Sequence, residues 1–242
     1  MHPLRVYWLG RRTYRSGLAW QVWARQQVAQ RDVLLLVEHT PVITIGTGGG
    51  WGLFRLAPER LIRQGIEIWQ IGRGGKITYH GPGQLVGYPI LDLRRHGRDV
   101  HQYLRRLEES LIRCCQTLGV SAHRIPSKTG IWVGNAKIAS IGIRVMHWTT
   151  THGFALNVQR QAQIPFTWIV PCGLHDPVTS LATVLGRDLE LHAIADRYAS
   201  AFAEVFGYVA IERVQAERAS DPNVEIPMCP VASVPGAFRT VI

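Results

Sequence analysis

The segment Pro171-Cys172-Gly173 places a cysteine between a residue with a fixed φ angle and one with free backbone torsions. This order favours a tight turn that presents the thiol on a loop. Such a thiol can act as a nucleophile if a neighbouring group lowers its pKa, because a free thiol with a pKa of about 8.5 is only a few per cent thiolate at pH 7. The alternative is a small hydrophobic side chain in a loop, which describes most free cysteines.

Lys137 is a candidate partner for that thiol. The chain contains 24 arginines and only three lysines, Lys76, Lys128 and Lys137. Lysine can lose its proton when its surroundings lower its pKa, whereas arginine stays charged. Lys137 interrupts an otherwise apolar strand region within residues 134–142. The alternative is a lysine on an edge strand that faces water and prevents pairing with other chains.

A third candidate is the glycine-rich segment 73–84, which also contains Arg73, Lys76 and His80. Glycine at this density lets the backbone approach a ligand closely. The segment is not a Walker A loop, because Gln70 stands where that motif requires glycine, and no G-x-G-x-x-G pattern is present. An ordinary hairpin loop remains the alternative.

The other cysteines and the histidines point away from metal or disulfide chemistry. The four cysteines form no C-x-x-C pair, and the ten histidines show no ligand spacing, so we expect no metal site, no disulfide framework and a reducing compartment. Cys114 and Cys115 lie within a predicted helix and are expected to be structural.

Composition describes a globular protein of 242 residues, with 46% hydrophobic and 18% charged residues. Disordered, collagen-like and coiled-coil classes are excluded. The longest aliphatic run, 33–37, is too short to span a bilayer, so we expect a soluble, unprocessed chain. The net charge of +10 predicts an acidic partner, either a nucleic acid or an acidic protein.

Apolar periodicity predicts the helices and strands that must position these groups. The pattern predicts helices at 16–31, 59–64, 99–118 and 189–206, and strands at 33–37, 42–45, 66–71, 85–91, 131–133, 138–145, 151–158 and 208–214. The strands from 131 to 158 are typical of an antiparallel meander. Because strands and helices do not alternate regularly, the fold class is α+β with a mixed sheet flanked by helices. We expect one domain over 1–216 and a proline-containing tail, extended or disordered, over 217–242.

Taken together, the motifs resemble a known family, the lipoyl(octanoyl) transferases of protein lipoylation. The matching blocks are R-G-G-x-x-T-x-H-x-P-G-Q at 73–84 with Tyr88-Pro89 after it, K-I-x-S-x-G at 137–142, H-G-x-A-L-N at 152–157, P-C-G at 171–173 and an N-terminal pattern at 39–46. They occur in order over roughly residues 5 to 210, and five such blocks are far more specific than one.

The resemblance implies the fold of biotin and lipoate protein ligase catalytic domains, a cytoplasmic location and no cofactor. It implies transfer of an octanoyl group from acyl carrier protein to a lysine of the lipoyl domains of 2-oxoacid dehydrogenases and the glycine-cleavage H protein, without a nucleic-acid or membrane partner. By position, Cys172 would accept the acyl group and Lys137 would lower its pKa. The implied substrate-binding residues are Arg73, Gly74, Gly75, Lys76, Ile77, Thr78, Tyr79, His80, Ser140, Ile141, Gly142, Gly153, Phe154 and Ala155.

Two other functions stay open at this point. An ATP-dependent lipoate or biotin ligase of the same fold would need no cysteine. A basic nucleic-acid-binding module would explain the charge, but it should interleave aromatic residues with basic ones on one face. Trp148 near Arg144 gives that function little support.

Overall fold

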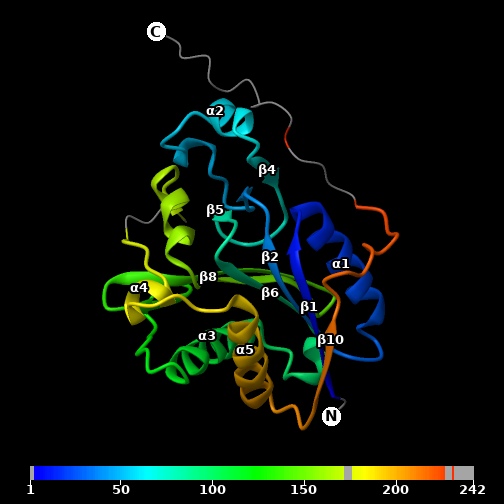
Figure 1. Cartoon of the computed structure of the whole chain (residues 1–242). Coiled ribbons are helices and arrows are strands. Elements are labelled where there is room, and N and C mark those ends of the chain that lie inside the picture. The colour runs from blue at the N-terminus through cyan, green and yellow to red at the C-terminus, as the bar shows by residue number, and fades with distance from the viewer. Residues whose placement is uncertain (1–2, 172–175, 227–230, 232–242) are drawn as a thin grey trace.

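A mixed β-sheet forms the centre of the protein, as the computed structural model of residues 3–171, 176–226 and 231 shows (Figure 1). The strands of this large sheet are β1 (Leu4–Arg12), β2 (Val33–His39), β6 (Gln84–Ile90), β7 (Ile131–Val133), β8 (Ala136–Met146), β9 (Thr149–Asn157) and β10 (Ile211–Gln215). They lie in the order β10-β1-β2-β6-β9-β8-β7. The pairs β10–β1 and β1–β2 are parallel, and all the others are antiparallel.

Helices cover both faces of this sheet (Figure 1). The helices are α1 (Tyr14–Gln27), α2 (Pro58–Arg63), α3 (Val100–Gln116), α4 (Leu181–Leu185) and α5 (Leu191–Phe206), with 3-10 turns η1 (Trp51–Leu53), η2 (Leu93–Arg95) and η3 (Arg160–Thr167). Successive side chains of a strand point to opposite faces. Leu34 and Leu36 of β2 therefore join the core under α3 and α5, while Leu35 and Val37 join the core under α1. Burial on both faces explains the uninterrupted apolar run of β2.

Side-chain caps mark where α1 and α3 begin. Thr13 Oγ1 accepts a hydrogen bond of 3.2 Å from the backbone N–H of Ser16 at the start of α1. Asp99 Oδ1 accepts one of 3.0 Å from the N–H of Gln102 at the start of α3. Each bond satisfies a backbone donor that the first turn leaves without an intrahelical partner.

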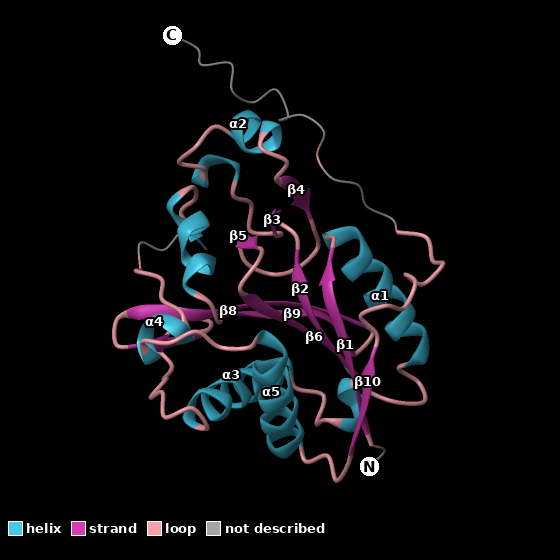
Figure 2. Cartoon of the chain, viewed as in Figure 1, coloured by secondary structure: helices cyan, strands magenta, loops and turns pink. Residues whose placement is uncertain are grey.

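A smaller sheet stands beside the large one and carries α2 on its outer side (Figure 2). Its strands are β4 (Glu67–Gln70), β3 (Val42–Ile45) and β5 (Ile77–His80), in that order, with β3 parallel to β4 and antiparallel to β5. The loop from β5 to β6 runs from the small sheet into the large one. The glycine-rich segment 73–84 therefore lies at the junction of the two sheets.

The chain beyond β10 runs along α1 and β1 (Figure 1). Arg12 Nη2 donates hydrogen bonds of 2.8, 2.9 and 2.7 Å to the carbonyl oxygens of Ala216, Glu217 and Ala219. Farther along, Ile226 packs against a cluster that includes Tyr14 and Trp69. Residues 217–226 form neither helix nor strand. The domain boundary at 216 stays a prediction.

The fold class is confirmed, with differences in single elements. The strands from 131 to 157 form the expected antiparallel meander. Strands β1 and β5 were not predicted, and helix α1 begins and ends before the predicted 16–31. Within the described residues, no helix has both the length and the apolarity needed to cross a membrane.

Candidate active site

Two adjoining cavities open where the small sheet meets the large one. The inner cavity is lined by Tyr14, Arg73, Gly75, Thr78, His80, Val86, Tyr88, 140–142 and 152–155. The outer groove is lined by Gly48, 74–76, Leu104, 127–129, Lys137 and 141–143. Gly75, Ile141 and Gly142 line both, so the two cavities are neighbours. The inner cavity is narrow: the space open to the centre of a water-sized sphere is about 40 Å³.

Neighbouring strands β8 and β9 form one wall of the inner cavity. Their antiparallel register places Ser140 opposite Ala155, Ile141 opposite Phe154 and Gly142 opposite Gly153. The structure thus brings together two predicted groups that are separate in the sequence. Glycine is required here, because a Cβ on Gly153 would lie 2.1 Å from the carbonyl oxygen of Gly87.

Arg73 is held against the small sheet, with only 6% of its surface exposed. Its Nη2 donates to the carbonyl oxygen of Thr44 at 2.7 Å and to Thr44 Oγ1 at 2.9 Å, and its Nη1 donates to the carbonyl oxygen of Gly74 at 2.9 Å. These bonds fix the guanidinium and keep a positive charge at the wall of the inner cavity.

Strand β5 divides its predicted site residues between two faces. Thr78 and His80 line the inner cavity. Ile77 and Tyr79 point the other way, into a hydrophobic cluster of the small sheet. This follows from the period-two alternation of a strand. Gly74 and Lys76 line the outer groove, whereas Ile77 and Tyr79 line neither cavity.

Buried histidines surround the inner cavity. Burial lowers the pKa of His39 to about 4 and that of His152 to about 3, and it holds the pKa of His80 well below its usual value. The charge of Arg73 adds to this effect at His80 and His152. All three rings are therefore neutral at pH 7. His39 Nε2 lies 2.7 Å from the hydroxyl of Tyr88, which lines the cavity.

Two buried polar atoms belong to residues that line this cavity. Thr78 Oγ1 and His152 Nδ1 have no hydrogen-bond partner among the residues that the structure describes. A buried polar group without a partner is costly, so such groups in a cavity wall are available to a bound molecule. The cavity combines these atoms with apolar contacts from Val86, Ile141 and Phe154.

Lys137 on β8 lines the outer groove, and only 6% of its surface is exposed. Its Nζ lies over the ring of Trp132, 5.0 Å from the centroid. Its backbone N–H donates to the carbonyl oxygen of Pro177 at 2.7 Å, and its carbonyl oxygen accepts from the N–H of Thr179 at 2.9 Å. These bonds place residues 177–179 alongside Lys137.

Cys172 lies outside the described residues, but the chain is fixed on both sides of it. The N–H of Val170 donates to the carbonyl oxygen of Leu53 at 2.7 Å. On the other side, the carbonyl oxygen of Pro177 accepts a hydrogen bond from the N–H of Lys137. Of the remaining cysteines, Cys114 and Cys115 are fully buried. Burial raises the pKa of Cys114 to about 12 and that of Cys115 higher still, so neither forms a thiolate near neutral pH.

Sequence reasoning did not select four residues of the inner cavity, namely Tyr14, Val86, Tyr88 and His152. His152 and Tyr88 stood inside quoted motifs, which was the available signal. Tyr14 and Val86 come from an ordinary helix turn and an apolar strand. Only their packing in the fold identifies them.

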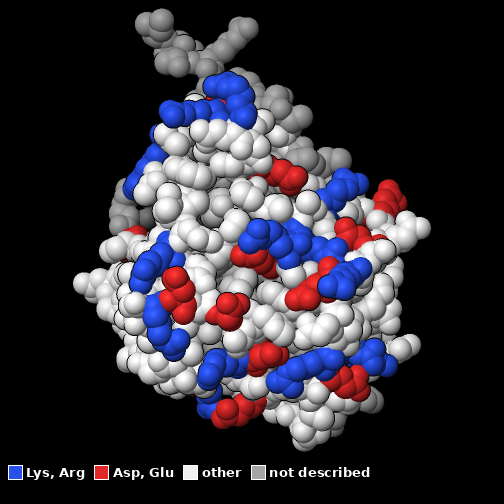
Figure 3. All heavy atoms as spheres, viewed as in Figure 1, with Lys and Arg blue, Asp and Glu red and all other residues white. Residues whose placement is uncertain are grey.

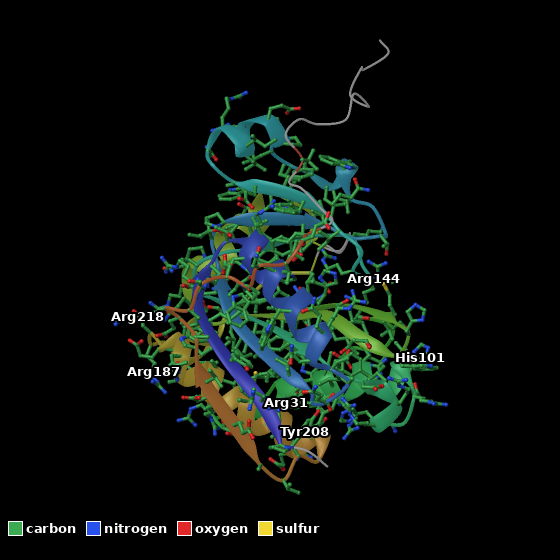
Figure 4. All side chains as sticks on the ribbon, turned by 90° about the vertical axis from the view of Figure 1, so that its right-hand side faces the viewer. Arg31, His101, Arg144, Arg187, Tyr208 and Arg218 are labelled. Atoms are coloured by element: carbon green, nitrogen blue, oxygen red, sulfur yellow. The ribbon has the colours of Figure 1, made fainter. Side chains whose placement is uncertain are left out.

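Charges are mixed on the surface around the site. The Arg144 side chain of β8 passes close to Gly72, where a Cβ would lie 2.5 Å from its Nη1 (Figure 4). On the face shown in Figure 3, basic side chains alternate with acidic ones, apart from a basic group over α2. This face carries no continuous basic stripe of the kind that nucleic acids select.

Comparison with known proteins identifies the family. The model of the lipoyl protein ligase A/B catalytic domain matches residues 13–203. An octanoyltransferase from Solibacter usitatus is 47% identical over 203 residues, covering 83% of this chain and 91% of the relative. An octanoyltransferase from Geobacter metallireducens is 46% identical over 198 residues, covering 80% of this chain and 89% of the relative.

Solved structures share the fold at low sequence identity. A bi-partite lipoate protein ligase from Thermoplasma acidophilum has a TM-score of 0.69 at 16% identity, covering 89% of this chain and 87% of its own. The biotin protein ligase from Aquifex aeolicus, in complex with biotin and ATP, has a TM-score of 0.53 at 11% identity, covering 86% and 71%. The family match and the identity to curated relatives together establish that this chain belongs to the octanoyltransferases of the lipoyl protein ligase A/B family.

Proposed function

We propose that this octanoyltransferase takes the octanoyl group from acyl carrier protein and passes it to a lysine of a lipoyl domain through a thioester on Cys172. The acceptors are the lipoyl domains of 2-oxoacid dehydrogenases and the glycine-cleavage H protein, and the reaction is the first step of endogenous protein lipoylation. These partners imply a cytoplasmic location and no cofactor. The observation that carries the mechanism is the nearly buried ammonium of Lys137 beside the chain that follows Cys172.

In the first step, the Cys172 thiolate attacks the carbonyl carbon of the carrier thioester. The Lys137 ammonium favours the thiolate, since an opposite charge nearby lowers a thiol pKa. A new C–S bond forms to Cys172, and the C–S bond to the carrier breaks. Lys137 gives its proton to the departing carrier sulfur and becomes neutral.

In the second step, the acceptor amine attacks the Cys172 thioester. Neutral Lys137 takes a proton from that amine, an amide bond forms, and the Cys172 thiolate leaves. Lys137 is again an ammonium beside a thiolate, so the cycle closes with protons and charges balanced. Arginine at this position could supply the charge but could not exchange the proton.

The inner cavity is the proposed site of the octanoyl chain. Ile141, Phe154 and Ala155 supply apolar contacts, and Thr78 and His80 supply polar ones near the carbonyl group. The proposed binding segment extends over Arg73, Gly74, Gly75 and Lys76 at the junction of the cavities. Ile77 and Tyr79 would support this segment from the core of the small sheet.

A transfer assay with purified components tests the function. Octanoyl-acyl carrier protein and an apo lipoyl domain are mixed with the enzyme, and the mass of the lipoyl domain is followed with and without ATP. We expect an octanoyl adduct at equal rates in both cases. Dependence on ATP together with free octanoate would instead assign the chain to the ligases of the same fold.

A further inference from the structure

A second lysine lies close to Lys137 and holds a carboxylate. Lys128 Nζ lies 2.7 Å from each carboxylate oxygen of Asp176, the first described residue after the gap that contains Cys172. Trp132 Nε1 donates to Asp176 Oδ2 at 3.2 Å. The ring of the same tryptophan lies 5.0 Å from Lys137 Nζ and 6.0 Å from Lys128 Nζ. One indole therefore contacts a carboxylate and two ammonium groups.

The two ammonium groups differ in their partners. Among the residues that the structure describes, Lys137 Nζ forms no hydrogen bond or ion pair, and its contact is the face of Trp132. The Asp176 carboxylate is instead paired with Lys128. The hydrogen bond from Lys128 is the largest cause that lowers the pKa of Asp176, and the charge of Lys137 makes a smaller contribution, so Lys137 lies within electrostatic reach of this carboxylate.

Other charged groups near Lys137 are already accounted for. Lys76 lines the same outer groove and adds positive charge. Glu108 of α3 accepts a hydrogen bond of 3.2 Å from the N–H of Gly130, whose α-carbon lies close to Lys137. That carboxylate is fully buried and is paired with Arg105 and Arg124 at 2.7 and 3.1 Å. Asp176 is thus the carboxylate whose pairing depends on a lysine of the groove.

We propose that Lys128 is a positioning residue that holds the Asp176 carboxylate away from Lys137, so that the charge of Lys137 stays available to Cys172. The inference rests on the proposed function. Without Lys128, the carboxylate would pair with the Lys137 ammonium across the indole. That pairing would weaken stabilisation of the Cys172 thiolate and would keep Lys137 protonated when it must accept a proton.

Removing Lys128 alone tests whether this residue affects the Cys172 thiol. In Lys128→Met, we expect the Cys172 thiol pKa to rise by about one unit, which lowers the thiolate fraction and the acylation rate about tenfold below that pKa. Alkylation of Cys172 by iodoacetamide, followed against pH by peptide mass, measures the thiol pKa without the acyl carrier. Lys128→Arg keeps the ion pair and should behave like the wild type.

The double variant separates this role from a merely structural one. Lys128→Met/Asp176→Asn removes both the lysine and the charge it controls, while the amide oxygen that replaces the carboxylate can still accept from Trp132. Our proposal predicts that thiol pKa and acylation return toward wild-type values. A structural ion pair predicts that the double variant is as impaired as Lys128→Met.

Controls keep the outcomes distinct. Arg5→Met breaks the exposed Arg5–Glu212 pair of 2.7 Å between β1 and β10 and should leave the thiol pKa unchanged. Thermal melting establishes that each variant is folded, and Lys128→Gln replaces Lys128→Met if the latter is not. An unchanged thiol pKa in folded Lys128→Met, or no recovery in the double variant, would overturn the inference. Failure of the wild type to form an acyl-enzyme would instead count against the proposed function.

Discussion

In the proposed mechanism, Lys137 has to satisfy two conflicting demands. It must carry a charge beside a thiol, and it must release and regain a proton in each cycle. Its side chain lies over the Trp132 ring with 6% of its surface exposed, and no carboxylate among the described residues forms an ion pair with it. The sequence indicated this lysine through its rarity and its apolar neighbours. Trp132 and Asp176 could not be selected from the sequence, because only contacts in the folded protein connect them with Lys137.

Lys137→Arg separates the two demands. We expect this variant to form the acyl-enzyme but to transfer the group slowly, because arginine stabilises the thiolate yet stays protonated. Losing general base catalysis should lower the rate of the second step by about 10²- to 10⁴-fold. Rapid-quench mass spectrometry would measure acyl-enzyme formation and decay separately.

Lys137→Met is the matched comparison, because it removes both charge and proton exchange. Both steps should be slow in this variant. If Lys137→Arg transferred the group to the acceptor at the wild-type rate, the role of Lys137 as a proton acceptor would be disproved.

At the scale of elements, apolar periodicity located the central strands and the long helices, while two strands were missed for identifiable reasons. β1 contains Arg5 and Arg11, which interrupt its apolar residues. In the fold, these arginines pair with Glu212 of β10 and Glu38 of β2, at 2.7 Å in each case. Partners so distant in the sequence leave no local signal. β5 was missed because the glycines around it dominated segment 73–84.

The pair β8–β9 also leads to a prediction about the length of the acyl chain that the enzyme prefers. Phe154 lines the inner cavity and packs on Tyr198 of α5, with ring centroids 4.3 Å apart. Phe154→Ala should extend the cavity toward α5 and move the preferred acyl chain from eight carbons toward ten or twelve. Each buried methylene contributes about 0.8 kcal/mol, so two more carbons should be favoured by roughly fifteenfold where they fit. Competition between carrier substrates of six to twelve carbons would measure the preference.

Leu156→Ala is the control for this experiment. Leu156 lies on the same strand in the same core, is fully buried and does not line the inner cavity. Both substitutions should lower stability by about 2–5 kcal/mol, but only Phe154→Ala should change the preference. An unchanged optimum in Phe154→Ala would show that this ring does not limit the chain.

At the scale of the whole molecule, the site forms where two sheets and distant segments meet. Strands β8 and β9 supply one wall, segment 73–84 supplies another, and residues 177–179 return along Lys137. The motifs at 73–84, 137–142 and 152–157 each contribute residues to the walls of the two cavities. They could not predict how β5 splits its residues between two faces, or that Tyr14 joins the inner cavity, because both depend on how the elements pack.

The most direct test of the account is the intact mass of the enzyme after mixing with octanoyl-acyl carrier protein in the absence of acceptor. We expect an octanoyl adduct that hydroxylamine removes and that peptide mapping places on Cys172. Cys172→Ala should show neither adduct nor transfer, whereas Cys114→Ala should keep both because its thiol is fully buried. Transfer that persists in Cys172→Ala, or an adduct on another residue, would contradict the thioester mechanism.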